Sequence, residues 1–127
     1  MKICKQIDQY IEFVRSDEAV VCEEQLLLCD FVEKVFTKED VYVDKKQLER
    51  YLGLEKYFPY KLLPWEQFCF ALHNCVYKRE DGQLRFPYLI ILVGRGAGKN
   101  GYLAFEDFAL ITPVNGVREY NIDIFAT

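Results

Sequence analysis

A glycine-rich segment that follows an apolar run constrains this chain more than any other feature. The segment spans residues 88–100 and reads YLIILVGRGAGKN. The continuous apolar run of Leu89–Val93 is typical of a strand that is buried on both faces. Glycines after such a strand let backbone N–H groups close around an anion, and a helix that begins near Lys99 adds the positive end of its dipole. The order of strand, loop and helix therefore predicts a phosphate-binding loop.

The loop departs from the standard phosphate-loop pattern, G-x-x-x-x-G-K-[ST], at two fixed positions. Val93 occupies the first glycine position, and Asn100 occupies the position of the final hydroxyl residue. The alternative interpretation is a glycine-rich surface turn with an incidental lysine. We favour phosphate binding because the largely apolar helical pattern of Tyr102–Leu110 follows the loop, as the motif requires.

Composition limits the classes of function. The 127 residues are 51% hydrophobic, which suffices for one packed domain but leaves no room for a complete ATPase of the P-loop type. A formal net charge of −4 gives no overall basic footprint for nucleic acid. No apolar run approaches the roughly 18 residues of a membrane span, and the N-terminal stretch lacks a signal-peptide core. We therefore expect a soluble, cytoplasmic protein that has no membrane attachment and does not bind DNA by this chain alone.

The five cysteines and the single histidine, His73, include no closely spaced ligand pairs, so the sequence predicts no zinc site. Cys22 and Cys29 are seven residues apart, and Cys69 falls on an apolar stripe. This spacing favours buried thiols in a reducing compartment. A nucleophilic pair of Cys69 and His73, one helical turn apart, is the alternative, but nothing nearby in the sequence would orient the histidine.

Two helices are expected to open the chain. Residues 2–15 place apolar side chains at alternating intervals of three and four. Ser16-Asp17 offers an N-cap for a second helix that continues to about Phe36. The apolar stripe of this second helix consists of Val20, Leu27, Phe31 and Val35.

Two more helices and a turn precede the glycine-rich segment. Asp44 can cap a short helix that ends near Gly53, and Pro64 suits the first turn of another. Asp81-Gly82 marks a tight turn. The later helix leaves Gln67 off its apolar face. That face consists of Trp65, Phe68, Cys69, Leu72 and Val76.

A second strand is expected after the loop helix. Residues 119–126 alternate between the two sides of a strand and follow a turn at 112–116. A strand, a helix and a strand in this order form a parallel pair with a right-handed crossover. The predicted fold class is α/β, with a helical region at 1–62. Region 63–127 is expected to be the first strand–loop–helix–strand unit of an incomplete P-loop NTPase sheet.

From Leu63 onward several motifs follow one another in the order of a known family. They are LPWEQF at residues 63–68, an Asp-Gly turn, Arg85-Phe86, the apolar run, GRGAGKN and a helix that leads to YNIDIFAT. In this order the chain resembles the start of the large terminase subunit of tailed bacteriophages, the ATPase that drives DNA into the empty capsid. The resemblance implies ATP and Mg²⁺ as cofactors and a phage or prophage protein in the bacterial cytoplasm. It also implies the small terminase subunit, the portal and double-stranded DNA as partners of the full-length protein.

Residue roles follow from the resemblance position by position. Gln67, in a Pro-Trp-x-Gln stretch, matches a glutamine that reads adenine, because an amide offers both a donor and an acceptor. Lys99 matches the lysine on the β- and γ-phosphates, and Arg95 matches an arginine that stabilises phosphate charge or senses the nucleotide. The cofactor-binding residues expected on this basis are Trp65, Gln67, Gly94, Arg95, Gly96, Ala97, Gly98, Lys99 and Asn100.

Two departures from the family limit the expected chemistry. Asn100 stands where a hydroxyl ordinarily holds Mg²⁺, and its amide oxygen is the candidate metal ligand. The family's metal-binding and water-activating carboxylates follow four apolar residues on a later strand, a pattern that this sequence lacks; Asp123 does not fit it. We therefore expect nucleotide binding without hydrolysis, and no catalytic residue beyond Arg95 as a charge stabiliser.

Two functions remain open at this point. The first is an N-terminal fragment of a terminase ATPase that binds nucleotide through its variant loop. The second is a free-standing, terminase-derived interaction protein that regulates the packaging machinery or a host factor without nucleotide chemistry. For the two residues singled out by the resemblance, the alternative is that Gln67 is an exposed helix amide and that Arg95 is a surface loop charge.

Overall fold

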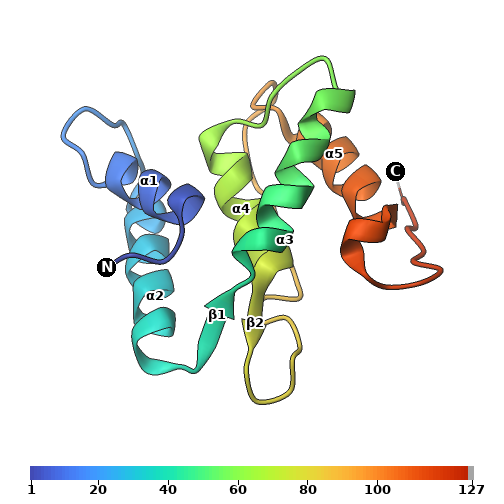
Figure 1. Ribbon diagram of the computed structural model, residues 1–127. Coiled ribbons are helices and arrows are strands. Elements are labelled where there is room, and N and C mark those ends of the chain that lie inside the picture. The colour runs from blue at the N-terminus through green and yellow to red at the C-terminus, as the bar shows by residue number, and fades with distance from the viewer. Residues whose placement is uncertain (126–127) are drawn as a thin grey trace. The chain divides into compact units, whose positions relative to one another are not determined.

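A computed structural model describes residues 1–125 (Figure 1). Over these residues the fold is mixed α/β and mostly helical, with five α-helices and one small antiparallel sheet of two strands. The chain forms two compact units. Unit 1 comprises Met1–Lys45 and Leu63–Leu89, and unit 2 comprises Lys46–Leu62 and the described residues from Ile90 onward. Within residues 1–125, no helix combines the length and the apolar character needed to cross a membrane.

Helix α1, Lys5–Val14, opens unit 1 and confirms the helix expected within residues 2–15. Its buried side chains are Ile7, Tyr10, Ile11 and Val14, the periodic positions of an amphipathic helix. The carboxylate of Asp8 accepts a hydrogen bond of 2.9 Å from the amide of Ile3. The apolar side of α1 packs on α2 and on a later helix of the same unit, which makes α1 part of the core of unit 1.

Helix α2, Glu23–Lys38, has its N-cap at Cys22, five residues after the expected cap at Ser16-Asp17, so that prediction is wrong. The hydroxyl of Ser16 donates to the carbonyl oxygen of Phe13 at 2.7 Å, so Ser16 terminates α1 instead of starting α2. Cys22 is the actual N-cap, and its backbone amide donates a hydrogen bond of 3.0 Å to the side-chain oxygen of Gln25. The predicted apolar stripe is also largely wrong. Of its four members only Val35 is buried, together with Cys29 and Val32.

The sheet of unit 1 pairs two short strands that the sequence did not indicate. Strands β1, Val41–Val43, and β2, Val76–Lys78, are antiparallel, with Tyr42 opposite Tyr77. The chain then turns at Asp81-Gly82, where Gly82 has a φ of 71°, which confirms the expected tight turn. Arg85 returns to the C-cap of α2 and donates to the carboxylate of Glu39 at 2.7 and 3.0 Å.

Helix α4, Pro64–Cys75, begins at the proline as expected. Its start is closed by the Glu66 carboxylate, which accepts a 2.7 Å hydrogen bond from the amide of Leu63. The helix packs on α1, where the rings of Tyr10 and Phe68 lie 4.4 Å apart. Of the predicted apolar face, Phe68, Leu72 and Val76 are buried, whereas Trp65 and Cys69 are half-buried.

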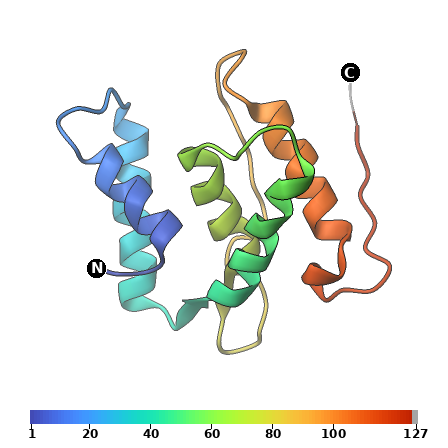
Figure 2. The same ribbon diagram turned by 45° about the horizontal axis from the view of Figure 1, so that its top comes forward.

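Unit 2 is built around helix α5, Lys99–Ile111, which begins at the predicted residue. It also contains nearly all of α3, Lys45–Leu52, which confirms the short helix expected after Asp44. Two 3₁₀ turns follow these helices, η1 at Gly53–Tyr57 and η2 at Pro113–Asn115. Helices α3 and α5 lie side by side (Figure 2), and the hydroxyl of Tyr51 lies 3.4 Å from the side-chain oxygen of Asn115.

The two strands expected around the glycine-rich loop do not form in the described part of the chain. Leu89–Val93 joins no ladder, and neither do residues 119–125; Ala126, the last residue of the second predicted strand, lies outside the described residues. Tyr88, Ile90 and Leu92 are between 84% and 91% exposed. An apolar run of this kind becomes a strand only when neighbouring strands take up its backbone hydrogen bonds. The described chain supplies no such neighbour, so a P-loop sheet is not part of the observed fold.

Candidate phosphate-binding loop

The glycine-rich loop forms a tight turn immediately before α5. The amide of Ala97 donates to the carbonyl oxygen of Gly94 at 3.3 Å. Gly96 and Gly98 have φ angles of 84° and 98°, in the left-handed region that side chains with a Cβ rarely adopt. Any other residue at these two positions would strain the turn. Glycine is therefore required here by the backbone conformation and is not merely tolerated.

The loop leads directly into the first turn of α5. Gly98 is the N-cap, and the amide of Tyr102 donates to its carbonyl oxygen at 3.0 Å. Helix geometry leaves the amides of Lys99, Asn100 and Gly101 without an acceptor inside the helix. These N–H groups and the positive end of the helix dipole form a site that favours an anion.

A hollow of about 590 Å³ lies against this turn and is lined by nine consecutive residues, 93–101. Arg95, Lys99 and Asn100 are exposed. The hollow is lined by two cationic side chains and no carboxylate, so its electrostatic character is positive. A pocket of this size can hold a group as large as a di- or triphosphate. The structure thus brings together all of the predicted site residues between Gly94 and Asn100.

Aromatic residues that the sequence analysis did not single out hold α5 in place. The hydroxyl of Tyr60 donates to the carbonyl oxygen of Gly101 at 3.0 Å. The ring of Phe58 lies 5.4 Å from the rings of Phe105 and Phe108. The cluster of aromatic residues YFPY at 57–60 is the signal that could have identified this support. It sets the position of the helix that carries Lys99.

Trp65 and Gln67 occupy the first turn of α4, in unit 1, whereas the loop belongs to unit 2. Both side chains are half-buried. The amide of Gln67 donates to the carbonyl oxygen of Leu63 at 3.0 Å, which places this residue within regular helix. Joint recognition of a base by Gln67 and of phosphates by Lys99 stays a prediction.

The metal prediction concerns a single side chain, Asn100, on the first turn of α5. Over residues 1–125, no group of three or more His, Cys, Asp and Glu side chains is arranged to hold a metal ion. A Mg²⁺ ion bound with a nucleotide takes most of its oxygen ligands from phosphates and water, so one amide oxygen can complete such a site. Asn100 as a Mg²⁺ ligand stays a prediction.

The cysteines divide into buried and accessible thiols. Cys4, Cys29 and Cys75 are buried, whereas Cys22 is exposed and Cys69 is half-buried. Desolvation by burial raises the pKa of the buried thiols, which keeps them protonated and unreactive. His73 does have an orienting partner, because its Nδ1 lies 2.8 Å from the carbonyl oxygen of Phe86. A carbonyl only accepts, so this nitrogen carries the proton.

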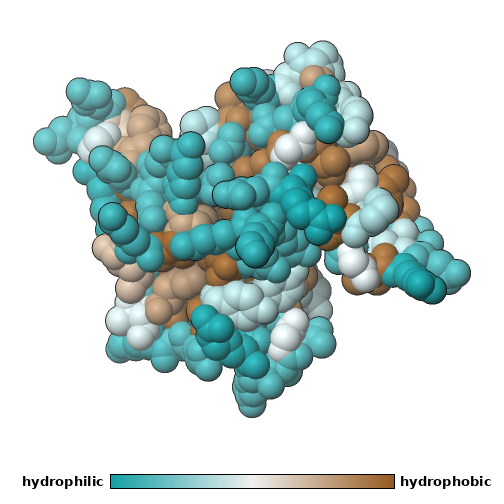
Figure 3. Space-filling model, in the orientation of Figure 1, coloured by the Kyte–Doolittle hydropathy of each residue, from teal (hydrophilic) through white to brown (hydrophobic). Residues whose placement is uncertain are grey.

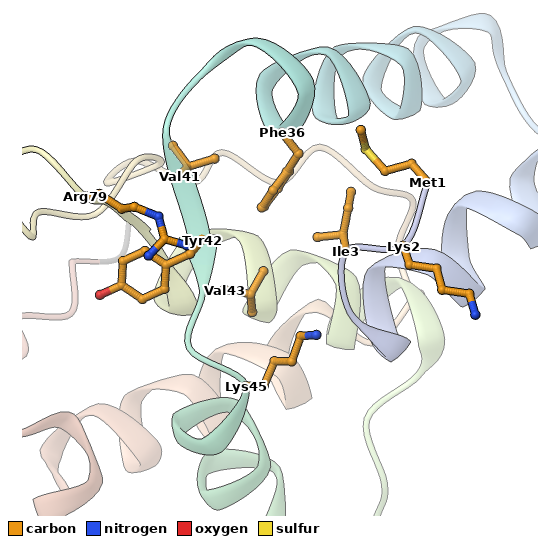
Figure 4. A pocket seen from close by; sticks show the side chains of 9 residues that line it. All are labelled: Met1, Lys2, Ile3, Phe36, Val41, Tyr42, Val43, Lys45 and Arg79. Carbon is orange, nitrogen blue, oxygen red and sulfur yellow. The ribbon is translucent and has the colours of Figure 1, made fainter.

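A second hollow, in unit 1, has a different character (Figure 4). It measures about 320 Å³, and Ile3, Phe36 and Val43 point into its middle. Arg79 lies at one side, where its Nε is 3.1 Å from the Asp40 carboxylate and its guanidinium carbon is 4.6 Å from the centre of the Tyr42 ring. Lys2 and Lys45 also line this hollow and no carboxylate does, so it is cationic as well, although its Arg79 is already paired and stacked.

The lining of the loop has donors and cations but no carboxylate. The loop presents backbone amides, a lysine and an arginine to an anion, and its lining contains no carboxylate that could position water. Comparison with known proteins adds no assignment, because no family model, no curated protein and no solved structure matches this chain.

Proposed function

We propose that this chain binds the phosphates of ATP or ADP through residues 94–100, as the nucleotide-binding N-terminal part of a terminase large subunit. One observation carries the binding proposal. A turn with two left-handed glycines and the first turn of α5 enclose one hollow, and every charged side chain that lines it is cationic. Anion sites at helix N-termini combine these same features.

Each part of the loop has a distinct role in this proposal. Lys99 places a compact positive charge on the β- and γ-phosphates, and Arg95 offers a planar fork that can contact two phosphate oxygens. The amides of the first turn donate to the remaining oxygens. Asn100 ligates Mg²⁺ alongside the phosphates. Outside the loop, the resemblance gives Gln67 on α4 the role of reading the adenine edge.

The terminase assignment adds the biological setting. It is supported by the run of motifs from LPWEQF to GRGAGKN, in which the segments matched to adenine reading and to phosphate binding follow one another in the order of the family. In the full-length protein the partners would be the small terminase subunit, the portal and double-stranded DNA, in the cytoplasm of a phage-infected or lysogenic bacterium. This chain contributes nucleotide binding to that assembly, and hydrolysis requires carboxylates that it does not contain.

The loop is tested by titrating a fluorescently labelled ADP into wild-type protein and into Lys99→Ala. Removing one charge-assisted contact to phosphate costs roughly 1.5–3 kcal/mol, so we expect Lys99→Ala to weaken binding by at least about tenfold. Lys46→Ala, an exposed lysine on α3, is the matched control and should bind as the wild type does. Inorganic pyrophosphate should compete with the label. Equal affinity of the wild type and Lys99→Ala would remove the phosphate-binding claim.

A further inference from the structure

Helix α2 presents an apolar stripe to solvent on a side that the core of unit 1 does not use. Leu27 and Phe31 are one turn apart and are 57% and 46% exposed, and Leu28 beside them is 42% exposed. The buried side of the same helix is formed by Cys29, Val32 and Val35. On the face of the molecule drawn in Figure 3, hydrophobic side chains reach the surface between hydrophilic ones. Contiguous exposed apolar side chains of this kind mark interaction surfaces.

The charges along this stripe follow a fixed order. Glu23 and Glu24 lie in the first turn of α2, one turn before Leu27. Lys34 and Lys38 continue the stripe beyond Phe31 at helical spacing, and all four of these charged residues are exposed. Read from its N-terminal end, the stripe is therefore acidic, then apolar, then basic.

Contacts with neighbouring residues affect the charge beside the stripe and the position of Phe31. The acidic residues on its flank, Asp30 and Glu33, are both engaged by Arg15 at 2.7 and 2.8 Å, so this arginine compensates one of their two negative charges within the chain. The ring of Phe86 packs edge-on against that of Phe31, with centroids 6.2 Å apart. Phe31 is thereby supported from one side, as an anchor residue of an interface usually is.

We propose that α2 is the contact surface of a homodimer in which two copies of the helix pack antiparallel about a two-fold axis. An acidic, apolar and basic order complements itself only when the second helix runs in the opposite direction. Leu27 then faces Phe31 of the second copy, and Glu23 lies beside Lys34 of the second copy. A parallel pair would instead place like charges opposite each other. The proposal is independent of nucleotide binding by the glycine-rich loop.

Sedimentation equilibrium over micromolar to millimolar concentrations tests the dimer. We expect a concentration-dependent dimer for the wild type, and a dissociation constant at least about tenfold higher for Leu27→Glu and for Phe31→Glu. The matched control is Ile111→Glu on α5, because Ile111 is exposed to 58%, nearly the same fraction as Leu27. Circular dichroism checks that each variant is folded. A wild type that stays monomeric throughout, or equal weakening by all three variants, overturns the proposal and leaves the stripe to a different partner.

The antiparallel register has its own test. Lys34→Glu and Glu23→Lys should each weaken the dimer, and the double variant should restore it, because the swapped charges again meet their opposites. In a Cys22→Ser background, which removes the exposed native thiol, Leu27→Cys and Phe31→Cys proteins should form a mixed disulfide when combined under mild oxidation. Preferential formation of the two symmetric disulfides would show a parallel pair and overturn the register.

Discussion

The hydroxyl of Tyr60 donates a hydrogen bond of 3.0 Å to the carbonyl oxygen of Gly101, a residue 41 positions later in the chain. Its ring atoms lie 3.5 Å from the point that a Cβ at position 101 would occupy, which is an ordinary van der Waals distance. Gly101 belongs to the first turn of α5 and shares neither the left-handed φ of Gly98 nor its role as N-cap. Gly98 is therefore constrained by its backbone conformation, whereas Gly101 is constrained only by its contact with the ring of Tyr60.

Alanine substitution should have opposite effects at these two glycines. Gly101→Ala introduces a Cβ at a tolerated contact and removes the conformational freedom of glycine within a helix, so we expect a gain of a few tenths to about 1 kcal/mol in the free energy of unfolding. Gly98→Ala places a Cβ in a left-handed conformation and should cost about 1–2 kcal/mol. Urea denaturation followed by circular dichroism measures both. Destabilisation by Gly101→Ala would show that the Tyr60 ring cannot accept the added methyl group.

The elements that could be predicted from the sequence are those whose conformation depends on residues close to one another in the chain. Helices α1 and α4 follow from local spacing and from Pro64 at a first turn. The turn at Gly82 follows from an Asp-Gly pair. The prediction for the start of α2 is wrong because the hydroxyl of Ser16 donates to the carbonyl oxygen of Phe13, at the end of α1. The sequence pattern does not distinguish this hydrogen bond from an N-cap of the next helix.

The elements that escaped prediction depend on distant partners. Strand β1 is three residues long and exists because β2 lies beside it, more than thirty positions later. The apolar run at Leu89–Val93 has strand composition but no neighbouring strand in the described chain, so it forms no strand and leaves Ile90 and Leu92 exposed. The loop itself was recognisable because its glycines and Lys99 are consecutive. The support that Tyr60 gives to Gly101 was not, because it joins two segments far apart in the sequence.

Purified protein should show no ATP hydrolysis above the uncatalysed background. Hydrolysis by a phosphate loop requires a carboxylate that holds the metal and a group that positions water, and none lines the hollow at residues 93–101. A coupled assay for released phosphate measures this directly. Turnover that disappears in Lys99→Ala would reveal a catalytic carboxylate elsewhere in the chain.

Glu66 should make the protein less stable as pH rises through the titration of its carboxyl group. Its side chain is buried, and desolvation raises the pKa of this carboxyl above its ordinary value, although the hydrogen bond from Leu63 opposes the shift. The folded state therefore holds the proton at pH values where the unfolded chain has released it. This contribution to the free energy of unfolding is fully present below the ordinary pKa and is lost as pH rises through the raised one.

Glu66→Gln isolates this effect. The amide oxygen still accepts from the amide of Leu63, so the helix start is kept while the titrating group is removed. We expect the variant to lose part of the pH dependence and to be at least as stable as the wild type at neutral pH. Thermal unfolding at a series of pH values, with Glu12→Gln on the exposed side of α1 as the control, measures the difference. Identical profiles for the wild type and Glu66→Gln would contradict the assignment.

Gln67 should discriminate between nucleotide bases. A side-chain amide that pairs with the adenine edge leaves polar groups unpaired when guanine presents the reversed pattern, at a cost of roughly 1–3 kcal/mol. Gln67→Ala should therefore lower affinity for ATP while scarcely changing affinity for GTP or inorganic pyrophosphate. Competition against labelled ADP measures all three ligands, and Gln9→Ala on the exposed side of α1 is the matched control. Loss of ATP and GTP binding in equal proportion, or of neither, would leave Gln67 as an ordinary amide of α4 and restrict recognition to the phosphates held by Lys99.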